Sequence, residues 1–176
     1  VYLPEGANPQ IHRPYELEKT IDVSFVGQCY GNRAQVINEL SRHGIHVRAY
    51  GHGWPAGPLE VEEMVKLYSR SKINLGFGGV AGHQDTFCLK GRDFEIPMSG
   101  GLYLTEDHPE LAHAFQPGEE ILTYRGIEDL VKKIRYYLEH TSAADSIRQK
   151  GHERALRDHT WENRMERVLR ILGLLE

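Results

Sequence analysis

Short apolar runs alternate with longer amphipathic stretches along most of this chain, and that alternation constrains its fold more than any other feature. Strands are expected at 22–27, 45–50, 73–77, 101–105 and 120–124. Helices are expected at 32–43 and 59–71, after Lys90, near 109–115, and from 127 onward in three segments broken near 141–142 and 159–160. Strands joined by helical crossovers pair in parallel with right-handed connections. The sequence therefore predicts a doubly wound, Rossmann-like α/β sheet with a C-terminal helical extension.

The start of the chain and the ends of its first helix carry local signals. Residues 1–20 contain prolines but little periodicity, which predicts an extended lead-in rather than a packed element. The folded domain is then expected to span 21–176. Within it, Asn32 is expected to cap the first helix and Gly44 to end it. Because the chain begins with Val1 rather than Met, it is expected to be part of a longer protein.

The composition indicates an enzyme domain rather than a nucleic-acid-binding or membrane-spanning protein. The formal net charge is −4 and the two signs are mixed, whereas a nucleic-acid surface needs a basic face. No apolar stretch approaches the length of a membrane span, and the N-terminus lacks a signal-peptide pattern, so a cytoplasmic location is expected. Cys29 and Cys88 lack metal-ligand spacing and are expected to be free thiols.

The segment from Leu89 to Gly101 carries the clearest chemical signal. Lys90 and Arg92 lie where a short helix is expected to begin, and a helix start adds unpaired N–H groups and the positive end of a dipole. These groups together predict an anion site. Glu95, one turn further, can accept hydrogen bonds from two hydroxyls of a sugar ring. A phosphate beside a diol describes a nucleotide, and more narrowly a nucleotide-sugar.

Three loops are expected to share one crevice, because ligands of a doubly wound sheet bind outside the carboxyl ends of its strands. They are 27–33, 51–54 and 78–90. Trp54 is expected either to pack the second loop or to form part of a nucleotide wall, and His83 lies in the loop that should cover a ligand. The ten histidines show no spacing typical of metal ligands, so no metal site is expected.

Several segments resemble one protein family in the order in which they occur. They are Leu3–Asn8, Phe25–Gly27, Asn32–Arg33, Tyr68–Leu75, Arg92–Gly100, Glu119–Tyr124, Ile134–Leu138 and His159–Arg164. Together they resemble the C-terminal, donor-binding half of a two-domain glycosyltransferase of the GT-B architecture. Within that class they resemble the CgeB-type group, which is related to the group 1 glycosyltransferases. Each segment alone is weak evidence, but their ordered occurrence is specific.

The resemblance implies half of a GT-B fold that transfers a sugar from a nucleoside diphosphate to an unidentified acceptor, with no further cofactor. Glu95 keeps the family's spacing to Gly100 and would hold the donor's ribose. The family's earlier glutamate, which contacts the donor sugar, would fall on Phe87, so that contact is missing. The acceptor site and the catalytic base would lie in an N-terminal GT-B domain. This chain alone would then bind nucleotide but show little or no transfer.

The resemblance also assigns the diphosphate of the donor. Backbone N–H groups around Lys90 and Gly91 would cradle it, beside the turn at Gly27. Lys90, Arg92 and Arg33 would neutralise its charge. Fixed cations and amide dipoles in a dry cleft stabilise a leaving diphosphate without a metal. The sequence contains no Asp-x-Asp metal-binding motif.

The same residues also have simpler interpretations. Glu95 can pair with Arg92 on one helix face, where such surface pairs contribute only about 0.3–0.5 kcal/mol. Lys90 and Arg92 can form a solvated face. Gly27 can be only the tight turn that ends a strand, and Arg33 can pair locally.

Two other functions are open. One is a non-catalytic module that senses a nucleotide or a phosphorylated sugar, which the loss of the family glutamate at Phe87 supports. The other is a receiver-like or flavodoxin-like signalling domain, which would share only the architecture. That domain needs an acidic cluster at the ends of the first strands or an apolar flavin slot. Asp22 begins its strand rather than ending it, which argues against this alternative.

The last predicted helix carries an apolar stripe formed by Met165, Val168, Leu169 and Leu172. In two-domain GT-B enzymes the last helix usually crosses back to brace the N-terminal domain. Without that domain, the stripe and the first 20 residues would lose their packing surface, which favours self-association or fraying.

Overall fold

The computed structural model describes residues 2–80, 83 and 86–175, which contain a five-stranded parallel sheet. The strands are β1 (Ile21–Val26), β2 (Val47–Tyr50), β3 (Ser71–Leu75), β4 (Tyr103–Glu106) and β5 (Leu122–Tyr124). Their order across the sheet is β2-β1-β3-β4-β5, and every neighbouring pair is parallel. A helix connects each strand to the next, so the predicted doubly wound sheet is confirmed.

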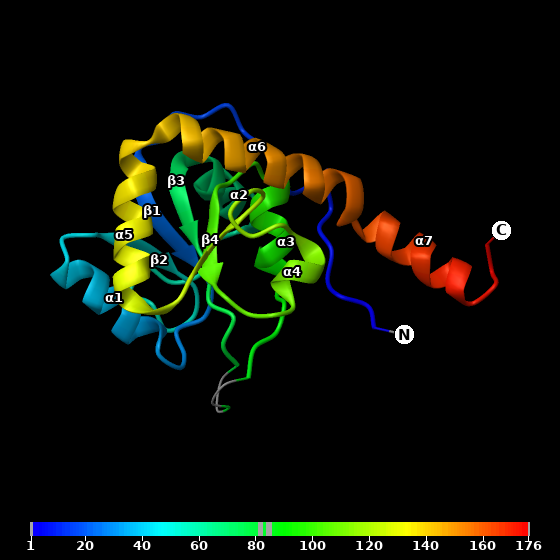
Figure 1. Ribbon diagram of the computed structural model, residues 1–176, viewed down its shortest axis with the longest axis horizontal. Helices are drawn as coiled ribbons and strands as arrows, with labels where there is room; N and C mark the ends of the chain where they lie inside the picture. The colour runs from blue at the N-terminus through cyan, green and yellow to red at the C-terminus, as the bar shows by residue number, and fades with distance from the viewer. Residues whose placement is uncertain (1, 81–82, 84–85, 176) are drawn as a thin grey trace.

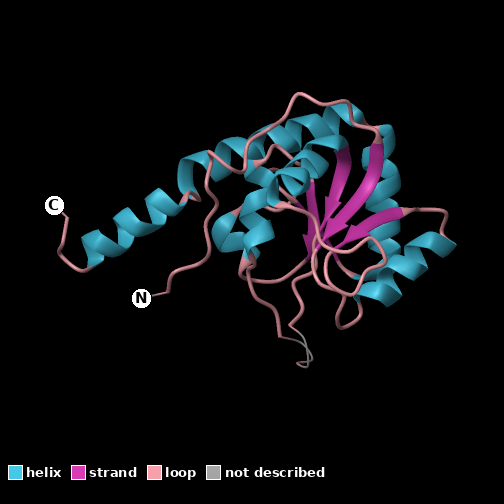
Figure 2. Cartoon of the chain, turned by 180° about the vertical axis from the view of Figure 1, so that it is seen from behind, coloured by secondary structure: helices cyan, strands magenta, loops and turns pink. Residues whose placement is uncertain are grey.

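Helices cover both faces of this sheet. They are α1 (Arg33–Arg42), α2 (Val61–Arg70), α3 (Gly91–Met98), α4 (Leu111–Ala114), α5 (Gly126–Glu139), α6 (Thr141–Asp158) and α7 (Trp161–Ile171). Side chains of α1 and α5 join one apolar core, and those of α2, α3 and α4 join the other. Figure 1 shows α6 crossing the end of the sheet where the strands begin, and in Figure 2 the connecting loops gather at the opposite end. None of the described helices is long and apolar enough to cross a membrane.

The boundaries of α1 and β3 show what sequence signals can and cannot specify. Gly44 has a φ of +76° and ends α1, as predicted. Asn32 precedes α1, but its side chain makes no capping hydrogen bond, so that prediction is wrong. Its backbone is not in the extended conformation that directs a capping side chain toward the first turn. The third strand ends at Leu75, two residues before the predicted end, and a Cβ atom at the next residue, Gly76, would overlap the hydroxyl of Tyr103, so glycine leaves room for that side chain.

Helix α6 lies very close to the backbone that leads into β5, and a glycine makes this approach possible. A Cβ atom at Gly151 would overlap the carbonyl oxygen of Glu120 and would lie 3.8 Å from Cβ of Pro97 in α3. Gly151 is buried in this contact. The helix therefore packs directly on backbone here, and glycine alone leaves the space.

The lead-in is extended, as predicted, but it is packed against the domain, contrary to the prediction. Ala7 is fully buried, and its N–H donates to the carbonyl of His159 (3.0 Å). The N–H of Trp161 in turn donates to the carbonyl of Ala7 (3.2 Å). Farther along, the N–H of Tyr15 donates to the hydroxyl of Ser69 (3.0 Å). The prolines disfavour regular structure, yet buried backbone groups must find partners. Those of Ala7 lie at the junction of α6 and α7, and that of Tyr15 lies in α2.

Two buried side chains hold this junction together. Nη2 of Arg164 donates to Nδ1 of His159 (2.7 Å), and Nε2 of His159 donates to the carbonyl of Ala114 (2.7 Å). Since arginine only donates and a carbonyl only accepts, His159 is the neutral tautomer with its proton on Nε2. Nε of Arg164 also donates to the carbonyl of Glu5 (3.3 Å), and its guanidinium carbon lies 5.4 Å from the centre of the Phe94 ring.

The predicted apolar stripe on α7 is exposed. Met165 is 44% exposed and Leu172 is 60% exposed, while Val168 and Leu169 are half-buried. Tyr2 in the lead-in is exposed as well. Figure 1 shows α7 and the lead-in leaving the domain on the same side. Two separate segments therefore present apolar side chains in one region of the molecule.

Replacing Gly151 by alanine tests the close packing of α6. Helix propensity alone predicts that Gly151→Ala stabilises the protein by up to about 1 kcal/mol. Overpacking against Glu120 predicts instead a net loss of about 1–3 kcal/mol in the free energy of unfolding, measured by urea denaturation. Ser146→Ala, at an exposed position of the same helix, should stay within about 0.5 kcal/mol of wild type. A Gly151→Ala protein as stable as wild type would contradict this packing.

The neutral His159 makes the protein sensitive to acid. Burial lowers the pKa of His159 to about 4, whereas an unfolded chain takes up this proton near pH 6.5. The stabilisation is therefore complete above about pH 6.5 and declines as the pH falls toward 4, with a loss of about 2 kcal/mol by pH 5.

Urea unfolding at several pH values between 7 and 5 measures this loss. The free energy of unfolding should fall less steeply in His159→Gln than in wild type, since glutamine does not titrate. His46→Gln, at an exposed position, is the matched control and should keep the wild-type slope. Equal slopes in all three proteins would show that His159 is not the acid-sensitive group.

Candidate functional site

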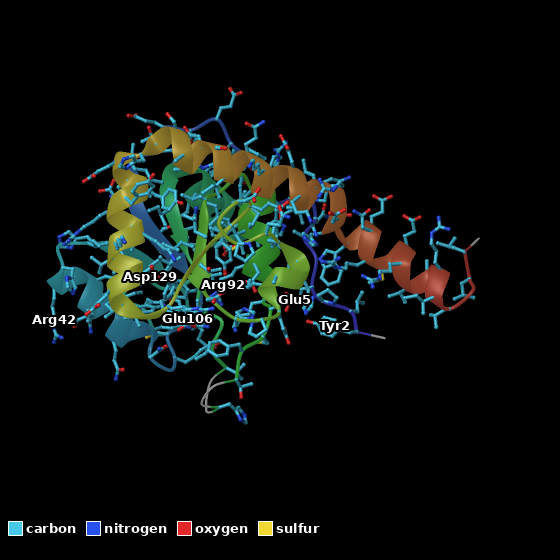
Figure 3. The ribbon with its side chains drawn as sticks, viewed as in Figure 1. Tyr2, Glu5, Arg42, Arg92, Glu106 and Asp129 are labelled. Atoms are coloured by element: carbon cyan, nitrogen blue, oxygen red, sulfur yellow. The ribbon has the colours of Figure 1, made fainter. Side chains whose placement is uncertain are left out.

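The candidate site lies at the carboxyl end of the sheet, between β1 and β3. The chain leaves β1 toward β2 on one side and later returns to β3 on the other, so a crevice opens between the loops that follow these strands. In Figure 3 the labelled side chains of Arg92 and Glu106 lie at this end of the sheet. This is the edge of the sheet at which the three loops 27–33, 51–54 and 78–90 were predicted to lie.

A cavity of about 600 Å³ opens at this edge, a volume typical of small-molecule sites. The loops after β1 and β3 and the end of β4 line it, through Tyr30, Gly31, Asn32, Arg33, Phe77, Gly79, Val80, His83, Thr86, Phe87 and Glu106. Two other hollows, of about 760 and 720 Å³, lie along α7 and away from the strand ends.

Arg92, in the first turn of α3, points at the turn after β1. Its guanidinium carbon lies 5.3 Å from the centre of the Phe25 ring, and its Nη1 is buried without a hydrogen-bond partner among the described residues. A Cβ atom at Gly27 would lie only 2.9 Å from this Nη1, so glycine leaves room for the cation. A buried N–H without an acceptor is unfavourable, and a bound anion would supply the missing acceptor.

Arg33 lies beside Arg92, at the start of α1. It is 1% exposed, and its guanidinium donates to the carbonyl of Gln28 (2.7 Å) and to the hydroxyl of Tyr30 (2.7 Å). Burial, and then the charge of Arg92, lowers the pKa of Arg33. The local pairing that the sequence left open for Arg33 is therefore present. Its charge nevertheless adds to that of Arg92, and an anion between the two cations would relieve their repulsion.

Lys90 braces the loop before α3. Its Nζ donates to the carbonyls of Gly78 (2.5 Å) and Cys88 (3.3 Å), and its backbone N–H donates to Oδ2 of Asp93 (2.6 Å). The resemblance implied that the backbone N–H and the side-chain ammonium of Lys90 both contact the diphosphate. In this structure both already have acceptors within the chain, so that role requires these bonds to break.

Glu95 lies one turn into α3 and faces the lead-in. Nε2 of His12 lies 3.8 Å from its Oε1, and among the described residues no ion pair joins Glu95 to Arg92. The local-pair alternative for Glu95 is therefore not realised. A Cβ atom at Gly91 would lie 3.0 Å from Oε1 of Glu95 and 2.7 Å from Oε2 of Glu5, so two carboxylates flank this glycine. Burial, and then the charge of Glu5, raises the pKa of Glu95.

Two carboxylates of the site were not predicted. Glu106, the last residue of β4, accepts hydrogen bonds from the N–H groups of Gly78 (2.9 Å) and Gly79 (3.1 Å). Asp93 is buried, accepts a hydrogen bond from the hydroxyl of Tyr103, and has a pKa raised by burial. Glu106 could have been predicted from the sequence, because it follows the apolar run of the fourth strand and must lie at the same edge of the sheet as the candidate loops. No sequence signal marks Asp93, because its burial depends on a strand that follows it.

Phe87, at the position where the family has a glutamate that contacts the donor sugar, lines the cavity. The ring stacks on the imidazole of His108, with centres 5.7 Å apart and planes inclined by 11°. His108 is 4% exposed, and within the described chain neither ring nitrogen has a hydrogen-bond partner. Burial lowers the pKa of His108. This wall of the cavity is therefore aromatic and uncharged at neutral pH.

Trp54 packs the second loop, one of its two predicted roles. Its Nε1 donates to the carbonyl of Gly27 (2.8 Å), and its ring meets the edge of Phe25 at a centre distance of 6.0 Å. His83 is exposed and lines the cavity. Its neighbours at 84 and 85 lie outside the described residues.

Each of two candidate loops carries one cysteine. Cys29 and Cys88 are free thiols, as predicted. Within the described ranges, no group of three His, Cys, Asp or Glu side chains is arranged to hold a metal ion.

Comparison with solved structures supports the fold. A sucrose-phosphate synthase from Thermosynechococcus elongatus is 14% identical, with a TM-score of 0.75 over 97% of this chain and 52% of that chain. The C-terminal domain of a group 1 glycosyl transferase from Francisella tularensis is 13% identical, with a TM-score of 0.61 over 89% of this chain and 100% of that domain. TarM from S. aureus, as a mutant in complex with fondaparinux, α-GlcNAc-glycerol and UDP, is 13% identical, with a TM-score of 0.68 over 91% of this chain and 37% of that chain. At such identities the likeness shows the fold, which is that of the C-terminal domain of GT-B glycosyltransferases.

The length and the sequence of the chain fit that likeness. The chain spans about half the length of the synthase that it matches. No curated protein sequence matches it. A family model described as glycosyl transferase-like matches residues 33–170. Since this match covers most of the sequence, the chain belongs to the glycosyl transferase-like family.

Proposed function

We propose that this chain is the donor-binding half of a two-domain glycosyltransferase that uses a nucleoside-diphosphate sugar. The observation that carries the proposal is the convergence of Arg92 and Arg33 near Gly27, where Nη1 of Arg92 is buried without an acceptor. Membership of the glycosyl transferase-like family supports it, and so does the UDP bound in the TarM structure of the same fold.

The two arginines explain how the donor would react. When the bond between the anomeric carbon and the diphosphate oxygen breaks, the electron pair stays on that oxygen and the leaving group gains negative charge. Arg92 and Arg33 are fixed cations in a cleft that is partly closed to water, where they stabilise this charge without reorganising. We place the base that takes the acceptor's proton in an N-terminal GT-B domain. Because arginines supply the neutralising charge, the proposed reaction is metal-independent.

The rest of the donor would extend to both sides of the diphosphate. Glu95, whose Oε1 lies 3.8 Å from Nε2 of His12, holds the ribose in this proposal. The stacked rings of Phe87 and His108 take the place of the acidic sugar contact. The order of the sequence motifs supports the CgeB-type group, and the unpaired thiols of Cys29 and Cys88 support a cytoplasmic location.

The N-terminal GT-B domain is the partner that would cover the exposed apolar side chains. Tyr2 and Leu3 in the lead-in, Met165 on α7 and Leu172 directly after α7 are all at least 40% exposed. Both segments leave the domain on the same side (Figure 1). An apolar surface of this kind is stabilised by a second domain rather than by water.

A non-catalytic sensor of nucleotides or phosphorylated sugars is the second candidate. The aromatic ring of Phe87 supports it, because the side chain expected to contact the donor sugar is replaced by one that cannot accept hydrogen bonds. Both candidates require the nucleotide site, and they differ in whether a sugar is transferred.

Replacing Arg92 separates ligand binding from stability. Nη1 of Arg92 has no acceptor in the described chain and Arg33 repels it, so Arg92→Gln should melt at or above the wild-type temperature without ligand. Hydrogen bonds to charged groups contribute about 1.5–3 kcal/mol, so the affinity for the preferred member of a panel of UDP, GDP, dTDP, ADP and CMP should fall about 10-fold or more. At about 100 times its dissociation constant, that ligand should stabilise the wild type by roughly 2.7 kcal/mol, which thermal melting detects.

Arg42→Gln is the matched control, since Arg42 pairs with Glu39 on the exposed side of α1. It should bind the nucleotide as the wild type does. Unchanged binding by Arg92→Gln would show that the arginine pair is not the diphosphate site.

Restoring an N-terminal GT-B domain distinguishes an enzyme from a sensor. The chain alone should bind nucleotide but release little or no sugar, because the proposed base is absent. With an N-terminal domain present, hydrolysis or transfer of the donor should appear and should depend on Arg92. Binding without any turnover in the two-domain protein would favour the sensor, and sustained turnover by these 176 residues would refute the half-enzyme proposal.

A further inference from the structure

A small hollow lies at the edge of the sheet where the strands begin, opposite the proposed donor site. Its volume is about 120 Å³, one fifth of that of the cavity at the carboxyl ends. Helix α6 crosses this edge (Figure 1). The lead-in, β3, α5 and α6 line the hollow through Lys19, Lys72, Tyr137, Thr141, Ala144, Asp145 and Arg148. Since pockets for drug-sized ligands measure about 300–1,000 Å³, this hollow suits a small ion rather than a nucleotide.

Lys19, in the lead-in, brings a cation to this hollow that no carboxylate of the described residues neutralises. Its Nζ donates to the carbonyl of Ser69 (2.9 Å), which uses one of the three N–H donors of the ammonium. Burial, and then the charge of Arg148, lowers the pKa of Lys19 to about 8. The ammonium is therefore held partly out of water and beside a second cation, where a bound anion would stabilise its charged form.

Arg148, in α6, is that second cation. Its side chain is only 12% exposed, and burial lowers its pKa. Nη1 pairs with Asp145, and Nη2 donates to the carbonyl of Lys72 (3.3 Å). Nε is buried and has no hydrogen-bond partner among the described residues. A buried N–H without an acceptor is unfavourable, so the guanidinium keeps one unsatisfied donor in a side chain that lines the hollow.

The start of α6 adds to the positive potential. The helix begins at Thr141, its first turn contains no acidic residue, and among the described residues no side chain makes a capping hydrogen bond there. Its first N–H groups and the positive end of its dipole therefore lie beside the hollow. Two carboxylates oppose this potential: Asp145 pairs with Arg148, and Asp22 pairs with Lys72 (2.6 Å). The charge of Lys19 stays uncompensated.

We propose that this hollow binds one small tetrahedral oxyanion, inorganic phosphate or sulfate, between Lys19 and Arg148. The oxygens of such an ion accept hydrogen bonds from the remaining N–H groups of Lys19 and from Nε of Arg148, and its charge relieves the repulsion between the two cations. Because Lys19 belongs to the lead-in and Arg148 to α6, the ion ties these two segments together. The site is separate from the proposed diphosphate site and does not depend on the proposed function.

The lining argues against other occupants of the hollow. A metal ion or an amine would find one carboxylate, that of Asp145, already paired with Arg148, and three cations around it. A neutral ligand would leave the repulsion between Lys19 and Arg148 in place. A carboxylate on a larger molecule would need more room than this hollow has.

NMR titrations of the protein with inorganic phosphate, sulfate and chloride, at constant ionic strength, test this assignment. The backbone amide signals of Thr141 and Arg148 should shift and saturate with phosphate or sulfate but not with chloride, and the two affinities show which oxyanion the site prefers. Lys19→Gln should weaken the binding about 10-fold, because it removes a charged hydrogen-bond donor. Asp145→Asn, which removes the carboxylate from the lining, should strengthen it.

Lys150→Gln is the matched control, since Lys150 is an exposed lysine on the same helix, and it should bind the oxyanion as the wild type does. Arg92→Gln should also keep the shifts at Thr141 and Arg148, because it alters only the proposed diphosphate site. The absence of saturable shifts at these two residues, or equal affinities of the wild type and Lys19→Gln, would refute the oxyanion site. Shifts confined to the surroundings of Arg92 would refute it too, while leaving the proposed function intact.

Discussion

The buried hydrogen bonds made by His159 and Arg164 fix the arrangement on which the rest of the structure depends. Together with the backbone bridge at Ala7, they join the lead-in, the end of α4 and the junction of α6 and α7. The guanidinium of Arg164 also lies against Phe94, the residue immediately before Glu95 in α3. The segments that leave the domain and the helix that carries the candidate site therefore belong to one packed unit, whose buried polar groups satisfy one another.

The candidate site brings together groups of like charge. Arg92 and Arg33 repel each other at one border, and Glu5 and Glu95 repel each other at another. Partial burial strengthens both repulsions, because less water is present to screen them. In the proposed function, a ligand that is anionic at one end and carries hydroxyls at the other would relieve both. This complementarity argues for a nucleotide more strongly than the fold does, since many unrelated activities share this architecture.

Most of the fold was predictable because it depends on local patterns, whereas much of the site depends on contacts between distant segments. The apolar runs located every strand, and the breaks near His159 separated the last helices correctly. The burial of Ala7 was missed, because its partners lie at the opposite end of the sequence and leave no local periodicity. The position of Arg92 in the first turn of α3 could be predicted from the local sequence alone. The bonds of Lys90 to the chain, and the approach of Glu5 to the site, follow only from how loops fold back onto α3.

The bridge at Ala7 also has a mechanical consequence. A body attached through a single chain can rotate about each bond of that chain. Here the lead-in and α7 leave the domain together, fastened by the two backbone hydrogen bonds of Ala7. Two tethers fastened side by side resist twisting about their common direction and leave bending as the easier motion, as in a hinge. Any part of the protein carried by both segments would therefore bend about this junction more easily than it would twist.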